Sequence, residues 1–272
     1  MKLISPPGLA ARPRDPQAVV GPIQAEGRVY FWQGGSLWIG RGQGRSQWHE
    51  HHALQISLAL DGVCRFRSDQ DGGWSEFTGA IVRSHRHHEF EVDGATMAQL
   101  FVEPETCEGR ALNERIPDAD VSPLPEPERI AMADLLLNAY KARLGANEMI
   151  AVAKAAVAVL AGASVPLTSV HPRVSKAIEH IRANLAGPIS LADVASAVAL
   201  SPSRLRHLFV RETGVAFRVY LLWLRLNLAI EASMAGKSWT AAAQEAGFAD
   251  SAHLTRTFKR MFGIVPAALV RR

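Results

Sequence analysis

The sequence predicts an α+β chain with two domains, a β-rich N-terminal half and an all-α C-terminal third. Short runs with β-strand composition lie between residues 28 and 102, whereas residues 173–272 contain segments with helical periodicity. The charge divides at the same place. Residues from His171 onward carry 14 Lys and Arg against 6 Asp and Glu, and the rest of the chain carries 16 against 20. At 272 residues and 48% hydrophobic content, the chain can form two cores.

Short strands are expected in the N-terminal half. Glycine-rich turns such as Gln33-Gly34-Gly35 and Asp71-Gly72-Gly73 separate them. The expected strands are residues 28–32, 37–40, 54–60, 63–67, 80–83 and 97–102. Many short strands with turns between them indicate an antiparallel β-barrel or jelly roll.

Two clusters in the β-rich region, residues 48–52 and 85–88, hold six of the ten histidines. His49, His51 and Gln55 have the same parity, so on an unbulged strand their side chains would share one face. The spacing of these three residues and Gly62 resembles the first motif of cupins, and residues 79–90 resemble the second. Many metal-binding cupins have Glu where this chain has Gln55.

The cupin resemblance implies a barrel with a candidate effector or metal pocket formed by His49, His51, Gln55 and His88. Three neutral imidazoles, those of His49, His51 and His88, could bind a divalent transition metal. A small organic effector in the same pocket is the second interpretation. A solvated histidine cluster is the third, because His52, His85 and His87 alternate out of register with the pocket face. No cofactor follows with certainty from these residues.

The composition of the chain changes twice between the β-rich region and the C-terminal third. Residues Pro104 to Pro127 contain five prolines and are expected to form an irregular strap. Helices are expected over Glu128–Leu144 and Glu148–Ala161, and the second is apolar on nearly all sides, which indicates burial on more than one side. Packing against the barrel and pairing with a second copy both account for that pattern. Residues Gly162 to Pro172 are expected to be the interdomain linker.

The C-terminal third contains a first helix-turn-helix pattern over residues 190–214. Ser190 and Asp193 form a capping box before a short apolar stripe. Ser201-Pro202 is an N-cap followed by proline at the first helical position, and Gly214 is placed to end that second helix. The short break between the helices makes them cross steeply, as in helix-turn-helix units.

A second helix-turn-helix pattern follows at residues 239–263. Residues Thr240–Ala246 make a supporting helix, and Asp250 or Ser251 caps a helix whose buried stripe includes Leu254 and Phe258. Residues Phe217–Ala235 are expected to form one helix of roughly 28 Å between the two units. A rod of that length can hold two recognition helices about one 34 Å DNA turn apart.

The outward faces of the two expected recognition helices are rich in hydrogen-bond donors suited to bases and phosphates. These residues are Ser203, Arg206, His207, Arg211, Ser251, Ala252, His253, Arg256, Lys259 and Arg260. The basic charge of the same region favours a nucleic-acid partner by counterion release from phosphate. Double-stranded DNA is therefore the predicted partner.

Residues 173–272 resemble the DNA-binding domain of AraC/XylS-type transcription regulators. The motif residues are Ala246-Gly247-Phe248, the run Leu254 to Arg260, Phe262-Gly263 and Pro266. An N-terminal cupin is a common partner of this domain in that family. The chain departs from the usual aromatic-Arg pair near the end, because it has Leu269-Val270-Arg271.

The resemblances together imply a sequence-specific transcription regulator whose DNA binding responds to a small effector in the barrel. The domain limits are 1–125 for the barrel with its strap, 126–161 for the helical hairpin, 162–172 for the linker and 173–272 for the DNA-binding domain. A homodimer through the hairpin is expected, and RNA polymerase is a possible further partner. The alternative is a metal-dependent cupin enzyme with a helical appendage, although the basic tandem units would have no use in it.

The first 16 residues lack the apolar core of a signal peptide, and no apolar run is long enough to span a bilayer. Cys64 and Cys107 are too few for a disulfide framework and are expected to be reduced core thiols. A cytoplasmic protein without a membrane partner is expected.

Overall fold

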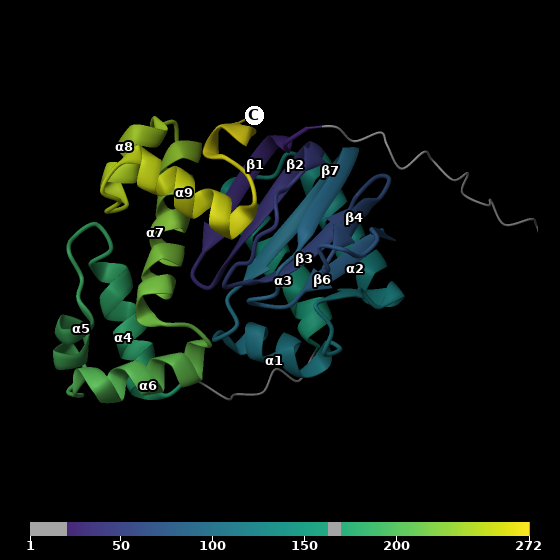
Figure 1. Cartoon of the computed structure of the whole chain (residues 1–272). Helices are drawn as coiled ribbons and strands as arrows, with labels where there is room; N and C mark the ends of the chain where they lie inside the picture. The colour runs from purple at the N-terminus through teal and green to yellow at the C-terminus, as the bar shows by residue number, and fades with distance from the viewer. Residues whose placement is uncertain (1–20, 163–169, 272) are drawn as a thin grey trace, which may run out of the picture.

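A computed structural model describes residues 21–162 and 170–271, with a sheet-rich N-terminal half and a helical C-terminal half (Figure 1). The strands are β1 (Gln24–Trp32), β2 (Gly35–Arg45), β3 (Leu54–Ala59), β4 (Cys64–Arg67), β5 (Ser75–Phe77), β6 (Gly79–Val82), β7 (Glu89–Val102), β8 (Val121–Pro123) and β9 (Leu269–Arg271). The six predicted strands are confirmed. Strands β5, β8 and β9 were not predicted, because three residues are too few to show a period-two pattern.

The long strand β7 organises the sheet. It pairs with β2 along most of its length, with β4 through its first half and with β3 through its second half. All strand pairs are antiparallel except β1 with β9, which brings the C-terminal strand to the edge of the N-terminal sheet. The fold class predicted from the sequence is thereby confirmed in its two parts, sheet and helices.

Alternation along β3 divides the sheet into two faces. Leu54, Ile56 and Leu58 are fully buried in an apolar cluster with the helices that follow the sheet in the chain. Gln55 and Ser57 point to the opposite face, since successive side chains of a strand alternate. The candidate pocket therefore lies on the face away from those helices.

Three helices cover the first face: α1 (Cys107–Arg115), α2 (Glu126–Lys141) and α3 (Ala146–Ala161). The prediction of an irregular strap over residues 104–127 is wrong, because α1 and β8 lie within it. Thr106 caps α1 by accepting a hydrogen bond from the backbone of Gly109, and the flanking prolines hid this short helix. The expected hairpin is present as α2 and α3.

The C-terminal half consists of α4 (Pro172–Ala183), α5 (Leu191–Ala197), α6 (Pro202–Thr213), α7 (Phe217–Met234), α8 (Trp239–Glu245), α9 (Ser251–Phe262) and the short 3-10 helix η1 (Pro266–Ala268). The predicted caps are present: Ser190 and Asp193 form the capping box of α5, and Ser201 and Asp250 cap α6 and α9. The helix α4 was not predicted.

Left-handed residues end both recognition helices. Gly214 follows α6 with φ 78°, and Gly263 follows α9 with φ 66°, conformations that glycine adopts without steric cost. Ala199, with φ 52°, provides the turn between α5 and α6. The two helix-turn-helix units therefore have the geometry that the sequence predicts.

Of the two apolar clusters among the described residues, one contains residues of both halves, and the other lies between the first sheet face and α1–α3. Phe262 at the end of α9 lies with its ring centroid 4.9 Å from Trp38 of β2 and 5.5 Å from Phe101 of β7. Trp223 of α7 is buried in the same cluster, 5.8 Å from Phe262. In Figure 1, α7 and α9 lie beside β1 and β2. The second sheet face is thus covered by the helical domain.

Residues 1–20 and most of the expected linker, 163–169, are outside the described residues. Cys64 is buried as expected, but Cys107 is exposed at the start of α1 and is not a core thiol. No single described helix has the length and apolar composition to cross a membrane, although α6 and α7 meet that test as a bent pair.

Candidate DNA-binding surface and sheet pocket

The first recognition helix, α6, presents the predicted polar face to solvent. Leu205 and Phe209 are fully buried beneath it. The predicted contact residues Ser203, Arg206, His207 and Arg211 are all exposed. Arg211 forms a salt bridge of 3.0 Å with Glu212, so its guanidinium is partly occupied in the free protein.

The second recognition helix, α9, is organised in the same way. Leu254, Phe258 and Met261 are buried, and Ser251, Ala252, Arg256, Lys259 and Arg260 are exposed. His253 differs from the prediction because it is half-buried, with its ring 5.2 Å from the ring of Phe248. Its contact with the turn leaves less of the imidazole available to a base.

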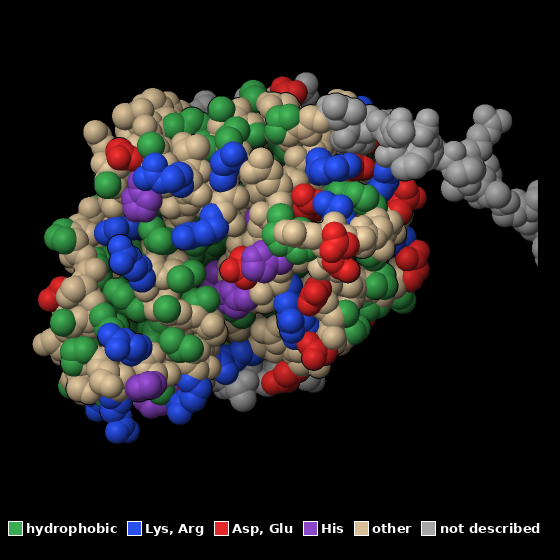
Figure 2. Space-filling model, viewed as in Figure 1, with side chains coloured by type: hydrophobic (Ala, Val, Ile, Leu, Met, Phe, Trp, Pro, Cys, Tyr) green, Lys and Arg blue, Asp and Glu red, His purple; other side chains and the backbone are tan. Residues whose placement is uncertain are grey.

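On the face in view, basic side chains predominate on the helical half of the molecule, whereas the sheet half shows acidic and basic side chains together (Figure 2). The face in view shows Lys and Arg over the region of α6, α7 and α9, as the charge division in the sequence predicts. A basic surface with two exposed recognition helices suits the phosphate backbone and base edges of DNA.

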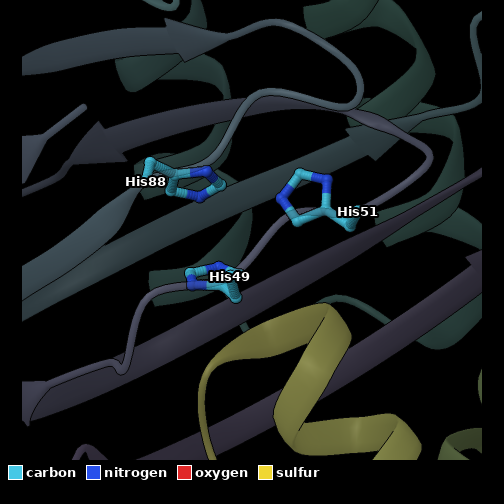
Figure 3. Close-up of side chains that lie close together, drawn as sticks. All are labelled: His49, His51 and His88. Carbon is cyan, nitrogen blue, oxygen red and sulfur yellow. The ribbon is translucent and has the colours of Figure 1, made fainter. Parts of the chain in front are cut away.

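The sheet pocket contains the predicted histidines in a tight group (Figure 3). One ligand nitrogen from each of His49, His51 and His88 lies within 4.8 Å of the others, and all three side chains are buried. The premise of one unbulged strand is wrong, however, since His49 makes an isolated bridge to His88 and His51 lies in a loop before β3. Loop geometry, not strand parity, brings them together.

Hydrogen bonds fix the tautomer of each histidine. The Nδ1 atoms of His49, His51 and His88 lie 2.8, 2.8 and 2.9 Å from backbone carbonyl oxygens, which can only accept. Each neutral ring therefore carries its proton on Nδ1 and a lone pair on Nε2. Such locking of one ring nitrogen is typical of histidines that bind a metal through the other.

Gln55 completes the group. Its Oε1 lies 2.8 Å from Nε2 of His51 and 3.3 Å from Nε2 of His88, and its Nε2 donates to Ser57 at 3.0 Å. The lone pairs of the two Nε2 atoms face the lone pairs of the amide oxygen, and no proton lies between them to form a hydrogen bond. Either a cation between them or an amide turned so that its NH₂ donates to both rings would satisfy the group.

Burial keeps these histidines uncharged. It lowers the pKa of His49 to about 3, with a smaller contribution from nearby His51, and it also lowers the pKa of His51. The pKa of His88 falls well below its ordinary value for the same reason, and His49 and His51 reinforce the effect. Neutral imidazoles are the protonation state that metal binding requires.

An apolar pocket opens beside this group, lined by residues of both halves. Its polar lining residues are Glu26, Arg28, Arg41, Ser46, His49, Gln55 and Gln99, whereas His51 and His88 are not among the lining residues. Its apolar lining from the sheet is Ile23, Ala25, Val29, Trp38, Ile39, Phe90, Val92, Met97 and Phe101. The C-terminal half contributes Met234, Phe262, Ile264, Leu269 and Val270. A ligand there would touch both domains.

Two buried glutamates join the domains, and no sequence pattern predicted their role. Glu103 accepts hydrogen bonds from Arg182 at 2.5 Å and from Trp223 at 3.2 Å. Glu105 lies 2.9 Å from His52, one of the histidines outside the pocket face. These acidic residues follow β7 directly, and only their partners from a distant part of the chain explain their burial.

The remaining histidines of the two clusters take other positions. His85 has a positive φ of 59° and lies with Nε2 3.4 Å from Nδ1 of His52. His87 is half-exposed beside Glu50 and stacks on Trp48 at 5.9 Å. None of these side chains lines the pocket.

Comparison with known proteins identifies the C-terminal region. Residues 194–272 match the helix-turn-helix domain family. The chain is 35% identical over 100 residues to an uncharacterized HTH-type transcriptional regulator, YidL, of Escherichia coli K12, covering 36% of this chain and 34% of that protein. It is 34% identical over 110 residues to the transcriptional activator RhrA of Rhizobium meliloti 1021, covering 39% and 35%. The matches span about a third of these relatives.

The whole architecture also has a solved counterpart. The structure of ToxT from Vibrio cholerae O395 matches with a TM-score of 0.54 and 12% identity, over 90% of this chain and 94% of that one. At this identity the likeness concerns the fold, a sheet-rich domain followed by helix-turn-helix units. Taken with the domain match and the regulator relatives, it shows that this chain has a helix-turn-helix domain over residues 194–272 and a fold similar to that of ToxT.

Proposed function

We propose that this protein is a sequence-specific DNA-binding transcription regulator whose affinity for DNA is modulated by a small effector in the sheet pocket. The observation that carries the proposal is the pair of exposed recognition faces on α6 and α9, on a domain that also closes the pocket. A ligand in the pocket would therefore contact residues of the DNA-binding domain and could change the position of that domain.

The relatives support this proposal. YidL is named as an HTH-type transcriptional regulator and RhrA as a transcriptional activator. ToxT has been solved with a bound naphthalenyl butenoic acid, in a structure that matches this chain with a TM-score of 0.52 and 11% identity. The apolar lining of the pocket described here suits an organic ligand with an apolar body.

A direct test is selection of duplexes from a random library by the purified full-length chain. The proposal predicts a defined consensus, with contacts in two successive major grooves on one face of the helix. A screen of small molecules by thermal shift, followed by DNA titration with each hit, tests the effector part. Hits that stabilise the protein without changing its DNA affinity would contradict modulation through the pocket.

The donor set also fits a divalent transition metal as part of the effector site. His49, His51 and His88 would bind through Nε2, and Gln55 would supply an oxygen that its hydrogen bond to Ser57 orients. Such an ion would hold the histidine group together and offer a polar anchor for a ligand in the adjoining apolar space. This reading competes with a metal-free pocket in which the amide donates to the rings.

We further propose a homodimer formed through the α2–α3 hairpin. Ile130 and Leu135 of α2 are 45% and 39% exposed, and Ala151, Ala155 and Ala158 of α3 are also exposed. Small and apolar side chains on one hairpin suit close helix packing between copies. Sedimentation of the chain with Leu135→Glu tests this, since the charge should produce monomers. We also propose that the protein acts in the cytoplasm and that it contacts RNA polymerase when it regulates transcription.

A further inference from the structure

Both recognition helices end against the sheet domain at a left-handed glycine. Gly214, after α6, has the imidazole of His85 as its neighbour, 3.6 Å from where a Cβ would lie. Gly263, after α9, lies directly on the backbone of Gln47, whose N–H donates a 2.7 Å hydrogen bond to the Gly263 carbonyl. The two C-caps therefore differ in how tightly they meet the sheet domain.

The contact at Gly263 leaves no room for a side chain. A Cβ at this position would overlap the carbonyl oxygen of Gln47 and would lie 2.7 Å from Nδ1 of His49. The same Gln47 oxygen accepts a hydrogen bond from Nδ1–H of His49, which fixes that ring in the histidine group. Figure 3 shows the C-terminal end of the chain passing next to His49. One backbone segment thus joins the histidine group to the second recognition helix.

We propose that Gly263 is a positioning residue: its contact with Gln47 and His49 lets the sheet domain hold the second recognition helix in the orientation used to bind DNA. This inference rests on the proposed function and adds the residue through which the sheet domain acts on DNA binding. The contact involves only the C-terminal end of α9. The base-reading turns at Ser251, Ala252 and Arg256 stay exposed while the helix is held.

Holding the helix in this way favours DNA binding. The first unit is also fixed to the sheet domain, since Arg110 of α1 bonds Glu212 of α6 at 3.0 Å. With both units on one body, less orientational freedom is lost when they enter successive grooves. Release of α9 from Gln47 restores that freedom and should weaken binding to a two-unit site.

The test compares Gly263→Asn with Gly214→Asn in the full-length chain. Asparagine tolerates the left-handed conformation, so both variants keep their helix caps, but only the side chain at 263 collides with backbone atoms. Hydrogen exchange at the Gln47 amide reports the contact, and fluorescence anisotropy with a duplex selected by the wild-type chain reports DNA affinity. Circular dichroism melting checks that both variants fold.

The proposal expects the Gln47 amide to be protected in the wild type and in Gly214→Asn and to exchange rapidly in Gly263→Asn. We expect Gly263→Asn to weaken DNA binding about tenfold, whereas the DNA affinity of Gly214→Asn should stay within about threefold of the wild-type affinity. If Gly263→Asn does not fold, Gly263→Ala, with a smaller side chain, should show the same signs.

Three results would overturn the proposal. They are an unprotected Gln47 amide in the wild type, equal DNA affinities for the two asparagine variants, and tighter DNA binding by Gly263→Asn. A wild-type chain that selects no DNA would instead overturn the proposed function. In that case the exchange of Gln47 would still decide whether Gly263 fixes the helix.

Discussion

The hydroxyl of Tyr220 donates a 2.7 Å hydrogen bond to the carboxylate of Glu105, which ties the helix between the two DNA-binding units to the sheet domain. Both side chains are buried. Burial opposes ionisation of Glu105, but His52 and the hydrogen bonds it receives outweigh this and lower its pKa to about 2. A buried carboxylate therefore stays charged at the domain interface because partners from both halves surround it.

Removal of that phenol should destabilise the whole chain. In Tyr220→Phe the charged Glu105 loses one of its donors without access to water, so we expect the free energy of unfolding to fall by about 2 kcal/mol. Urea unfolding measures the change. Tyr140→Phe is the control, because no hydrogen bond of the Tyr140 hydroxyl occurs among the described residues. Equal unfolding midpoints for the two variants would contradict a structural role for the Tyr220–Glu105 bond.

Because these histidines are buried, we expect the folded protein to lose stability in mild acid. Burial lowers the pKa of His49 from its ordinary value of 6.5 to about 3 in the folded protein, and it lowers the pKa of His85 to about 4. At pH values between the folded and the unfolded pKa of each ring, the unfolded chain binds more protons than the folded chain. The contribution of these rings to the free energy of unfolding therefore decreases as the pH falls below 6.5 and does not change well above 6.5. Each responding histidine contributes about 1.4 kcal/mol per pH unit.

Urea unfolding of metal-free protein from pH 7.5 to pH 5 measures this slope. His49→Gln should reduce this slope by about the contribution of one histidine. A stability that does not change between pH 6.5 and pH 5 would show that these imidazoles are not buried as neutral groups in solution.

Cobalt distinguishes the two readings of the histidine group. If His49, His51 and His88 bind a transition metal, one equivalent of Co²⁺ should give visible absorption bands and raise the unfolding free energy by about 2.7 kcal/mol at a free concentration 100 times Kd. His51→Ala should abolish both effects, and His87→Ala should abolish neither. Binding that is as weak in the wild type as in His51→Ala would favour the metal-free group, with the Gln55 amide donating to the rings.

The helical third was the most predictable part of the chain. Its caps, turns and buried stripes are local signals: Ser190, Ser201 and Asp250 each accept a bond from a backbone N–H three residues later, so short-range sequence specifies them. The short β9 was missed because its partner, β1, lies more than 240 residues away in the chain. Pairing between strands so far apart in the chain leaves no recognisable pattern in the residues of either strand.

The histidine group was predicted correctly in membership but for a partly wrong reason. His49, His51, His88 and Gln55 do lie together, yet the loop before β3 places the first two, not a regular strand. The shared core of the two halves was not predicted. Phe262 has the helical spacing of an ordinary core residue, and nothing in its neighbours along the chain shows that half of its environment comes from the sheet.

The arrangement of the two units predicts that α6 and α9 each read one part of a DNA site. Arg206 and Arg256 are exposed on early turns of these helices, where a guanidinium can reach O6 and N7 of a guanine. The most direct measurement is the base preference of Arg206→Ala and Arg256→Ala at every position of the selected site, with Lys141→Ala on α2 as the control. We predict that each arginine variant loses about 1–3 kcal/mol of binding free energy and relaxes the preference in a different half of the site, about one helical turn apart. Base preferences identical to those of the wild type in both variants would contradict the claim.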